Sequence, residues 1–185
     1  MSDRPDPGRD RTDPVTGHTG GVPEPCPCDL PATYDACCGR FHRGEAAAPT
    51  AELLMRSRYA AFALGLGAYL VNTLSAAHPD RARPRLPLER ELSRARVTQR
   101  FTSLRILFSA TGGPSGEDPD RGQVLFLAGV FVQGRDRSFI ELSDFVREGG
   151  AWRYAGGVGG AAALFAGELA SLTPDAFVAR LAAEA

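Results

Sequence analysis

All four cysteines of this 185-residue chain lie between positions 26 and 38, and this clustering constrains the fold more than any other feature. A Cys-x-Cys pair is followed, after eight residues, by an adjacent Cys-Cys pair: Cys26, Cys28, Cys37 and Cys38. Zinc takes four thiolate ligands in a tetrahedron with bonds of ~2.3 Å, and two tight pairs of sulfurs can supply such a site. We therefore predict that the four cysteines bind Zn²⁺.

Three other roles of these cysteines compete with the metal site. A disulfide would bridge adjacent Cys37 and Cys38 only with strain, and the amino terminus lacks the basic and then apolar pattern of a secretory signal. A redox pair is more often Cys-x-x-Cys on a thioredoxin-like pattern, and unrelated core thiols would be scattered along the chain. The spacing of the cysteines favours a zinc site over these three roles. The site would be structural rather than catalytic, because four thiolates leave no open position on the metal. His42 is the one nearby substitute ligand, and we expect a solvated surface histidine there.

Local signals predict how the two cysteine pairs converge. Asp29 is expected to cap a short helix with Pro31 in its first turn, which would bring the second pair back toward the first. Gly39 stands where a left-handed helix terminus is wanted. The expected exposed apolar face of this segment, with its basic rim, consists of Leu30, Tyr34, Phe41, Arg40 and Arg43.

The cysteine spacing resembles the SEC-C motif, a zinc knuckle first recognised at the carboxyl end of the SecA translocation ATPase. The four cysteines, Tyr34 and Gly39 match the motif, whereas its usual Gly-Ser-Gly is replaced by Asp29-Leu30-Pro31. The resemblance implies Zn²⁺ as the cofactor of a knuckle at residues 25–45. Because the SecA knuckle contacts other proteins, it also implies a protein partner that docks on this knuckle.

The composition narrows the class of protein. Hydrophobic residues make up 43% of the chain and charged residues 23%, as in a soluble globular protein, and the formal net charge is -1. All 21 basic residues are arginine, so Schiff-base chemistry and a lysine base are excluded. No apolar run approaches the ~20 residues of a membrane span. Together with the lack of a secretory signal pattern, this leads us to expect a cytoplasmic protein that does not bind a membrane. The arginines of residues 81–100 alternate with prolines and acids rather than with stacking aromatics, so we do not expect nucleic-acid binding.

Residues 1–24 contain almost no apolar side chains, and we predict a disordered tail there. Helices are predicted for residues 51–64, with Thr50 as the N-cap, for residues 68–77 and from Pro87 onward. The first of these helices should bury one face at helical spacing, formed by Met55, Tyr59 and Phe62.

From Val97 the apolar period changes from 3.6 to 2, which indicates strands. Three further strands are expected at residues 123–133, 138–148 and 151–155, and the short glycine-bearing turns between them favour antiparallel neighbours. The run 123–133 is almost continuously apolar, which is typical of a strand covered on both faces. The predicted fold is therefore α+β, with two or three helices packed on a four-stranded antiparallel sheet.

A second resemblance rests on residues 54–62, which read Leu-Met-Arg-Ser-Arg-Tyr-Ala-Ala-Phe. Together with the cysteines, residues 141–148, Trp152 and Tyr154, they are similar to the YchJ family. Its members join a SEC-C knuckle to a nuclear-transport-factor-two-like domain, which implies a cone-like domain with a curved sheet at residues 50–157. Residues 158–185 lie outside the resemblance. There we expect the rest of a glycine hinge, Gly156–Gly160, and a C-terminal helix capped by Thr173 that folds back on the sheet or forms a homodimer contact.

The resemblance also implies a pocket between the curved sheet and the first helix. Polar candidates to line a ligand site there are Arg58, Tyr59, Tyr69, His78, Glu141, Ser143 and Arg147. Glu141 shares a strand face with Phe139 and Phe145, and a carboxylate among apolar neighbours is normally paired. Arg58 is the predicted partner of Glu141, so a structural ion pair competes with a ligand-binding role.

Two functions of different class follow from these features. The first is a zinc-binding, non-enzymatic accessory or adaptor protein that couples a docking knuckle to a pocket for a small molecule or a peptide. The second is a small hydrolase, isomerase or dehydratase that uses Glu141 or His78 as a general base. The closed metal shell favours the first function, and the polar residues of the pocket keep the second one open.

Overall fold

A computed structural model describes residues 24–113 and 116–184 of the chain. Its centre is an antiparallel sheet with the strand order β1-β2-β4-β5. The strands are β1 (Gln99–Gly112), β2 (Asp118–Val132), β4 (Phe139–Glu148) and β5 (Ala151–Ala161), with a two-residue strand β3 (Arg135–Asp136) paired to β2. The predicted α+β fold with helices on an antiparallel sheet is confirmed. The predicted disordered tail lies outside the described residues as far as position 23.

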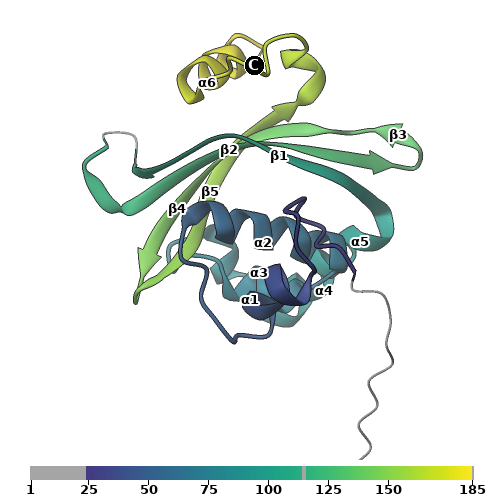
Figure 1. The fold of residues 1–185 in the computed structure, drawn as a ribbon, viewed down its shortest axis with the longest axis vertical. Helices are drawn as coiled ribbons and strands as arrows, with labels where there is room; N and C mark the ends of the chain where they lie inside the picture. The colour runs from purple at the N-terminus through teal and green to yellow at the C-terminus, as the bar shows by residue number, and fades with distance from the viewer. Residues whose placement is uncertain (1–23, 114–115, 185) are drawn as a thin grey trace, which may run out of the picture.

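Helix α2 (Ala51–Leu64) lies across the concave face of the curved sheet and has the predicted bounds (Figure 1). The Thr50 hydroxyl accepts a hydrogen bond from the Leu53 N–H at 3.1 Å and so satisfies one free amide of the first turn. Gly65 ends the helix in the left-handed conformation, with φ 73°. Shorter helices extend this layer: α3 (Gly67–Asn72), η2 (Pro79–Ala82), α4 (Arg85–Ser93) and α5 (Ala95–Thr98).

The predicted second helix, residues 68–77, is wrong in its second half, because α3 ends at Asn72. The backbone leaves the helix to pair with strand β5. The Tyr154 N–H donates to the Thr73 oxygen at 2.8 Å, and the Ser75 N–H donates to the Tyr154 oxygen at 2.9 Å. Helix α4, predicted from Pro87, begins earlier, with Pro87 inside its first turn, where the missing N–H costs no hydrogen bond.

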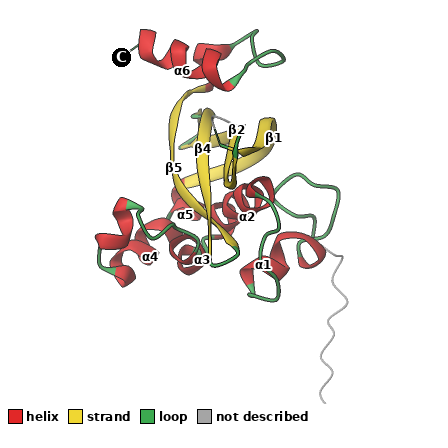
Figure 2. Ribbon diagram, turned by 90° about the vertical axis from the view of Figure 1, so that its left-hand side faces the viewer, coloured by secondary structure: helices red, strands yellow, loops and turns green. Residues whose placement is uncertain are grey.

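Strand β2 is covered on both faces, as its continuous apolar sequence predicts. Val124 and Phe126 point toward α2 and belong to the main core cluster. Leu125, between them, belongs to a second cluster that includes the C-terminal segment. Successive side chains of a strand point to opposite faces of the sheet, so one strand supplies both clusters. Figure 2 shows helices on the two sides of the sheet.

The glycine-rich stretch Gly156–Gly160 is not the predicted hinge but part of β5, and it pairs with β4 in continuous register. The glycines are explained by close packing. A Cβ on Gly157 would lie 2.8 Å from the Oε1 of Glu141, and a Cβ on Gly160 would lie 2.5 Å from the Cδ2 of Leu181. Glycine in a strand often marks such an approach of other atoms to the backbone, so a glycine-rich composition alone does not establish a hinge.

After β5, the short helix η3 (Ala162–Phe165) and helix α6 (Pro174–Ala183) turn back over the convex face of the sheet (Figure 1). Thr173 caps α6 as predicted, accepting a hydrogen bond from the Ala176 N–H at 3.3 Å. The rings of Phe165 and Phe177, both fully buried, lie 5.0 Å apart. The prediction of a helix folded back on the sheet is confirmed. None of the helices within residues 24–113 and 116–184 has the length and apolar character needed to span a membrane.

Candidate metal centre and ligand cavity

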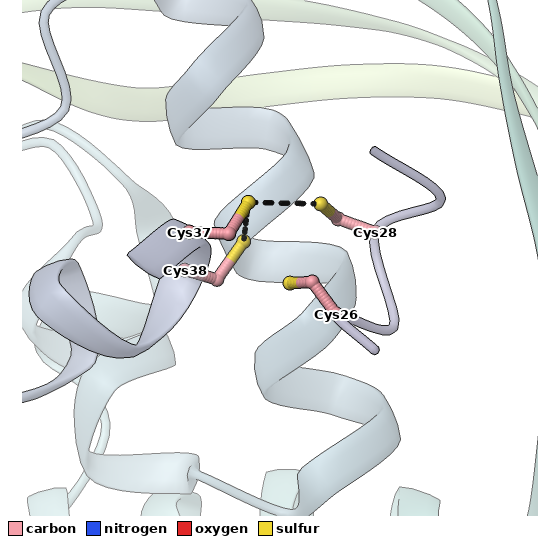
Figure 3. Close-up of side chains that lie close together, drawn as sticks. All are labelled: Cys26, Cys28, Cys37 and Cys38. Carbon is pink, nitrogen blue, oxygen red and sulfur yellow. Dashed lines mark hydrogen bonds between the residues drawn. The ribbon is translucent and has the colours of Figure 1, made fainter. Parts of the chain in front are cut away.

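The four cysteines converge on one point, as Figure 3 shows. The first pair comes from a turn and the second pair from the short π-helix η1 (Asp35–Gly39). All four sulfur atoms lie within 4.8 Å of one another and all four residues are buried. The sulfur of Cys37 lies 3.5 Å from that of Cys28 and 3.9 Å from that of Cys38. A tetrahedron with metal–sulfur bonds of ~2.3 Å has edges of about 3.8 Å, so the cluster fits a tetrahedral metal ion.

The thiols of the cluster influence one another's ionisation. Hydrogen bonds from neighbouring thiols, above all from Cys28, lower the pKa of Cys26. The contact with the Cys26 sulfur raises the pKa of both Cys28 and Cys38. The Cys26 thiolate therefore forms readily while Cys28 and Cys38 keep their protons, which a metal ion would displace on binding. All four cysteines are free rather than joined in disulfides.

The predicted helix cap at Asp29 is wrong. The helix begins only at Asp35, and Asp29 has a left-handed backbone with φ 61°. Its carboxylate Oδ2 instead accepts a hydrogen bond from the Leu104 N–H of β1 at 2.6 Å. The predicted left-handed terminus at Gly39 is also wrong, since its φ is -54°. Glycine is required there because a Cβ would lie 2.8 Å from the Tyr34 backbone oxygen.

The knuckle packs into the core of the domain that follows it. The four cysteines share one cluster of buried residues with Leu54 and Met55 of α2 and with β2. Phe41 is only 5% exposed, and Leu30 and Tyr34 are half-buried against the same cluster. The predicted exposed apolar face of the knuckle is therefore wrong, because these side chains bury their apolar surface against the rest of the chain.

His42 is not the solvated histidine that the sequence predicts. Its Nδ1 lies 2.9 Å from the Tyr34 hydroxyl, and its Nε2 lies 2.9 Å from the backbone oxygen of Ser57 in α2. The Ser57 hydroxyl in turn lies 2.6 Å from the hydroxyl of Tyr69. Burial lowers the pKa of His42, so the neutral ring is favoured. With the Nε2–H donating to Ser57, Nδ1 accepts from Tyr34, and the imidazole links the knuckle to α2.

A cavity of about 260 Å³ lies between α2 and the concave face of the sheet. The structure places five of the seven predicted polar residues in its wall: Arg58, Tyr59, His78, Glu141 and Ser143. Tyr69 lies elsewhere, edge-on to His42 with ring centroids 4.5 Å apart. Arg147 is exposed, with its guanidinium carbon 4.8 Å from the centroid of the Trp152 ring. Apolar and further lining residues are Met55, Phe62, Leu74, Asp80, Leu92, Phe101, Phe126, Phe139, Phe145 and Tyr154.

Arg58 is buried in the wall of this cavity. Its Nη1 donates to the Leu70 oxygen at 2.8 Å and to the Thr73 hydroxyl at 2.5 Å. Its guanidinium carbon lies 4.5 Å from the centroid of the Tyr154 ring, a cation–π arrangement. Burial lowers the pKa of Arg58 to about 10. Within the described part of the chain, no carboxylate lies at salt-bridge distance from Arg58, so the predicted ion pair with Glu141 is wrong.

Tyr154 contacts both members of the predicted pair. Arg58 covers the face of its ring, and its hydroxyl donates to the Oε1 of Glu141 at 3.1 Å. The Ser143 hydroxyl donates to the same oxygen at 2.6 Å. Burial raises the pKa of Tyr154, so its hydroxyl stays protonated and can donate. Sequence reasoning missed this role of Tyr154, although its alternation with Trp152 along one strand already placed it on an inner face.

His78 completes the polar part of the wall. Its Nδ1 accepts a hydrogen bond from the Asp80 N–H at 3.2 Å, which leaves the ring proton on Nε2. Burial lowers the pKa of His78, so the neutral form is favoured. The His78 and Tyr154 rings lie 5.5 Å apart.

Comparison with known proteins places the chain in a family. Residues 50–157 match the family described as YchJ, middle NTF2-like domain. The chain belongs to the YchJ family. A UPF0225 protein of Streptomyces coelicolor is 46% identical over 133 residues, which cover 72% of this chain and 94% of the relative. A UPF0225 protein of Cupriavidus pinatubonensis is 39% identical over 127 residues, with 69% of this chain and 78% of the relative covered.

Two solved structures of SEC-C motif containing proteins are similar to this YchJ-family chain. The one from Rhodopseudomonas palustris has a TM-score of 0.59 and 35% sequence identity, and the match covers 72% of this chain and 96% of that one. The one from Psychrobacter arcticus has a TM-score of 0.58 and 26% identity, with 70% and 79% covered. The predicted combination of a SEC-C knuckle with an NTF2-like domain is confirmed, and the cysteine cluster is a candidate metal site.

Proposed function

We propose that this chain is a zinc protein whose metal fastens the SEC-C knuckle to the NTF2-like domain, and that the cavity of this domain binds a small ligand without converting it. The observation that carries the proposal is that the cysteine cluster packs against helix α2. Arg56 of α2 donates from Nη1 to the backbone oxygen of Cys28 at 3.0 Å. The same helix carries Arg58, Tyr59 and Phe62 into the cavity wall. A metal at the cysteines would therefore hold one wall of the ligand cavity.

Zinc is the metal that this donor set fits best. Four thiolates are soft ligands that favour zinc over magnesium or calcium, and the sulfur separations suit a tetrahedral ion. When bound, Zn²⁺ would supply a structural cross-link, since a closed shell leaves no position for water or substrate. A site of free thiolates also suits a reducing compartment, which supports the expectation of a cytoplasmic protein.

An adaptor role would use the outer side of the knuckle. Because Phe41 is buried, a protein partner would meet polar rather than apolar side chains there. Arg43 is exposed and pairs with Asp35 at 2.7 Å and with Glu45 at 2.6 Å. These charges suit a small, transient contact at the low end of interface sizes. Pull-down with Arg43→Glu should lose a partner that the wild type retains, and a partner kept by the variant would exclude this surface.

Metal analysis tests the zinc site directly. We expect one zinc per chain in protein purified without oxygen. Elemental mass spectrometry gives the zinc content, which is compared with the protein concentration. Cys37→Ser should lose most of the zinc, because three thiolates and a hydroxyl form a weaker shell. The exposed Ala36 provides a matched control, and Ala36→Ser should keep the metal. Protein without zinc, or with a native Cys28–Cys37 disulfide, would contradict the proposal.

An enzymatic function is the second candidate, and one observation favours it. Two donors hold the Oε1 of Glu141 inside the cavity, which orients the second carboxylate oxygen to accept a proton. Glu141, or neutral His78, could then act as the base of a hydrolase, isomerase or dehydratase. Incubation of a bound ligand with wild type and with Glu141→Gln, followed by NMR, separates the two functions. Conversion by wild type alone would support the enzyme, and an unchanged ligand in both samples would support the binding protein.

A further inference from the structure

We propose that the cavity takes a small carboxylic acid with an apolar body, whose carboxylate pairs with Arg58. This inference rests on the proposed role of the cavity in ligand binding and deepens it by naming the chemical class of the ligand. It starts from the buried charge of Arg58, which no carboxylate of the described residues contacts, and from the apolar side chains around it.

Within residues 24–113 and 116–184, no counter-ion contacts the charge of Arg58. Arg58 is 8% exposed, and among the described residues its hydrogen bonds go only to the Leu70 oxygen and the Thr73 hydroxyl, both from Nη1. In the part of the chain that the structure describes, its Nε and Nη2 have no such partner. Of the fully enclosed side-chain polar atoms in the described residues, only the Oε1 of Glu89 lacks a hydrogen bond, so these nitrogens of Arg58 are open to the cavity.

A buried cation without a counter-ion is costly, and the ring of Tyr154 offsets this cost only in part. The planar guanidinium matches a carboxylate, which can accept two parallel hydrogen bonds from Nε and Nη2. Of the two carboxylates in the wall, Glu141 acts on Arg58 only through space, and neither contacts the guanidinium. Asp80 pairs with Arg83 at 3.1 Å, and the Oε1 of Glu141 is held by two hydroxyl donors.

The rest of the wall requires an apolar body. The rings of Tyr59 and Phe101 meet edge to face at 5.4 Å, and Phe62 stacks beside Phe101 at 6.3 Å. On the facing sheet, Phe126 and Phe139 meet at 6.1 Å. The cavity of about 260 Å³ is smaller than the ~300–1,000 Å³ of drug-sized sites. The ligand is therefore small, with an aromatic or branched aliphatic body and one carboxylate.

Three probes of one shape and different charge test this inference on the zinc-loaded full chain: benzoate, benzylamine and benzyl alcohol. NMR titration should show benzoate binding about tenfold or more tightly than benzyl alcohol, and benzylamine binding most weakly. The shifted signals should belong to Tyr154, Phe145 and Phe101, and not to the knuckle. Arg58→Gln in folded protein should remove the preference for benzoate while leaving the affinity for benzyl alcohol within about threefold.

The outcomes separate the inference from the function on which it rests. Stronger binding of benzylamine, or equal binding of benzoate and benzyl alcohol, would overturn the inference while keeping the cavity as a binding site. A preference for benzoate that survives Arg58→Gln would also overturn it. Failure of all three probes to bind would contradict the ligand-binding function itself. The comparison of probes on wild type needs no variant, so it remains decisive even where Arg58→Gln does not fold.

Discussion

The Nε2 of His42 lies 2.9 Å from the backbone oxygen of Ser57, the residue that directly precedes Arg58 in helix α2. This hydrogen bond connects the knuckle to the turn of helix that supplies the cavity with its buried charge. Two more hydrogen bonds hold the knuckle on the domain. Arg56 of α2 donates to the Cys28 oxygen, and the Leu104 N–H of β1 donates to Asp29. The metal site and the cavity are therefore parts of one folded unit, and their stabilities should be coupled.

Removal of the metal should destabilise the domain as well as the knuckle. Because the cysteines share a core cluster with Leu54 and Met55, we expect chelation or Cys37→Ser to lower the melting temperature by roughly 5–15 °C. Amide exchange should accelerate in α2 as well as in residues 25–45. Unchanged exchange in α2 of the metal-free protein would show that the two parts are independent.

His42 should make the stability depend on pH. Burial lowers its pKa below the ordinary value of 6.5, so near that pH the unfolded chain takes up a proton that the folded chain does not. The contribution of His42 is therefore fully present above pH 6.5 and is lost as the pH falls through its pKa in the folded state. Urea unfolding between pH 7.5 and about 5 measures this loss. His42→Gln should flatten the profile relative to wild type, and protonation of the thiolates cancels in that comparison. An NMR titration of His42 at or above 6.5 would contradict the assignment.

Tyr154 should contribute through its ring and its hydroxyl separately. Tyr154→Phe keeps the ring beneath Arg58 but removes a donor to Glu141, and should cost ~0.5–1.5 kcal/mol of unfolding free energy. Tyr154→Ala also removes the ring packed between Phe145 and His78, and should cost ~3–5 kcal/mol. Equilibrium unfolding in urea measures both values. Equal losses in the two variants would show that the ring does not contribute.

Asp29 combines an unfavourable backbone conformation with a useful side chain. Its left-handed backbone favours glycine, whereas its carboxylate accepts the Leu104 N–H. Asp29→Gly should lose the hydrogen bond but relieve the strain, so its net effect should be within about 1 kcal/mol. Asp29→Ala loses the bond and keeps the strain, and should be less stable than Asp29→Gly by ~1 kcal/mol. Asn tolerates this backbone and keeps an acceptor, so Asp29→Asn serves as the control. Greater stability of the Ala variant than of the Gly variant would rule out a role for the backbone conformation.

The sequence predicts best where a signal is local. The bounds of α2 follow from Thr50 and Gly65, and the spacing of the four cysteines predicts that they cluster. It fails where a distant segment decides the outcome. Gly156–Gly160 has the composition of a hinge, and only its pairing with β4 makes it a strand. The stretch after Asn72 has helical periodicity, but its backbone forms hydrogen bonds with strand β5 instead of continuing the helix.

The predicted pair of Arg58 and Glu141 fails for a related reason. Each residue lies on the face that periodicity predicts, and both line the same cavity. The side chain of Tyr154 contacts each of them, and it comes from a strand that follows both in the sequence. Periodicity places a residue on a face, but it does not tell which of several side chains on that face will be its neighbour.

The second core cluster has a consequence during protein synthesis. Its partner surface on the sheet, which includes Leu125, Ile140 and Leu142, is complete when β5 has been made. The side chains that cover it, Phe165 and Phe177, leave the ribosome only afterwards. Until then the nascent chain carries an apolar surface on the outside of an otherwise finished sheet, which makes it prone to association with other chains. Residues 162–183 thus decide how long this face of the sheet stays open to association with other chains while the domain folds.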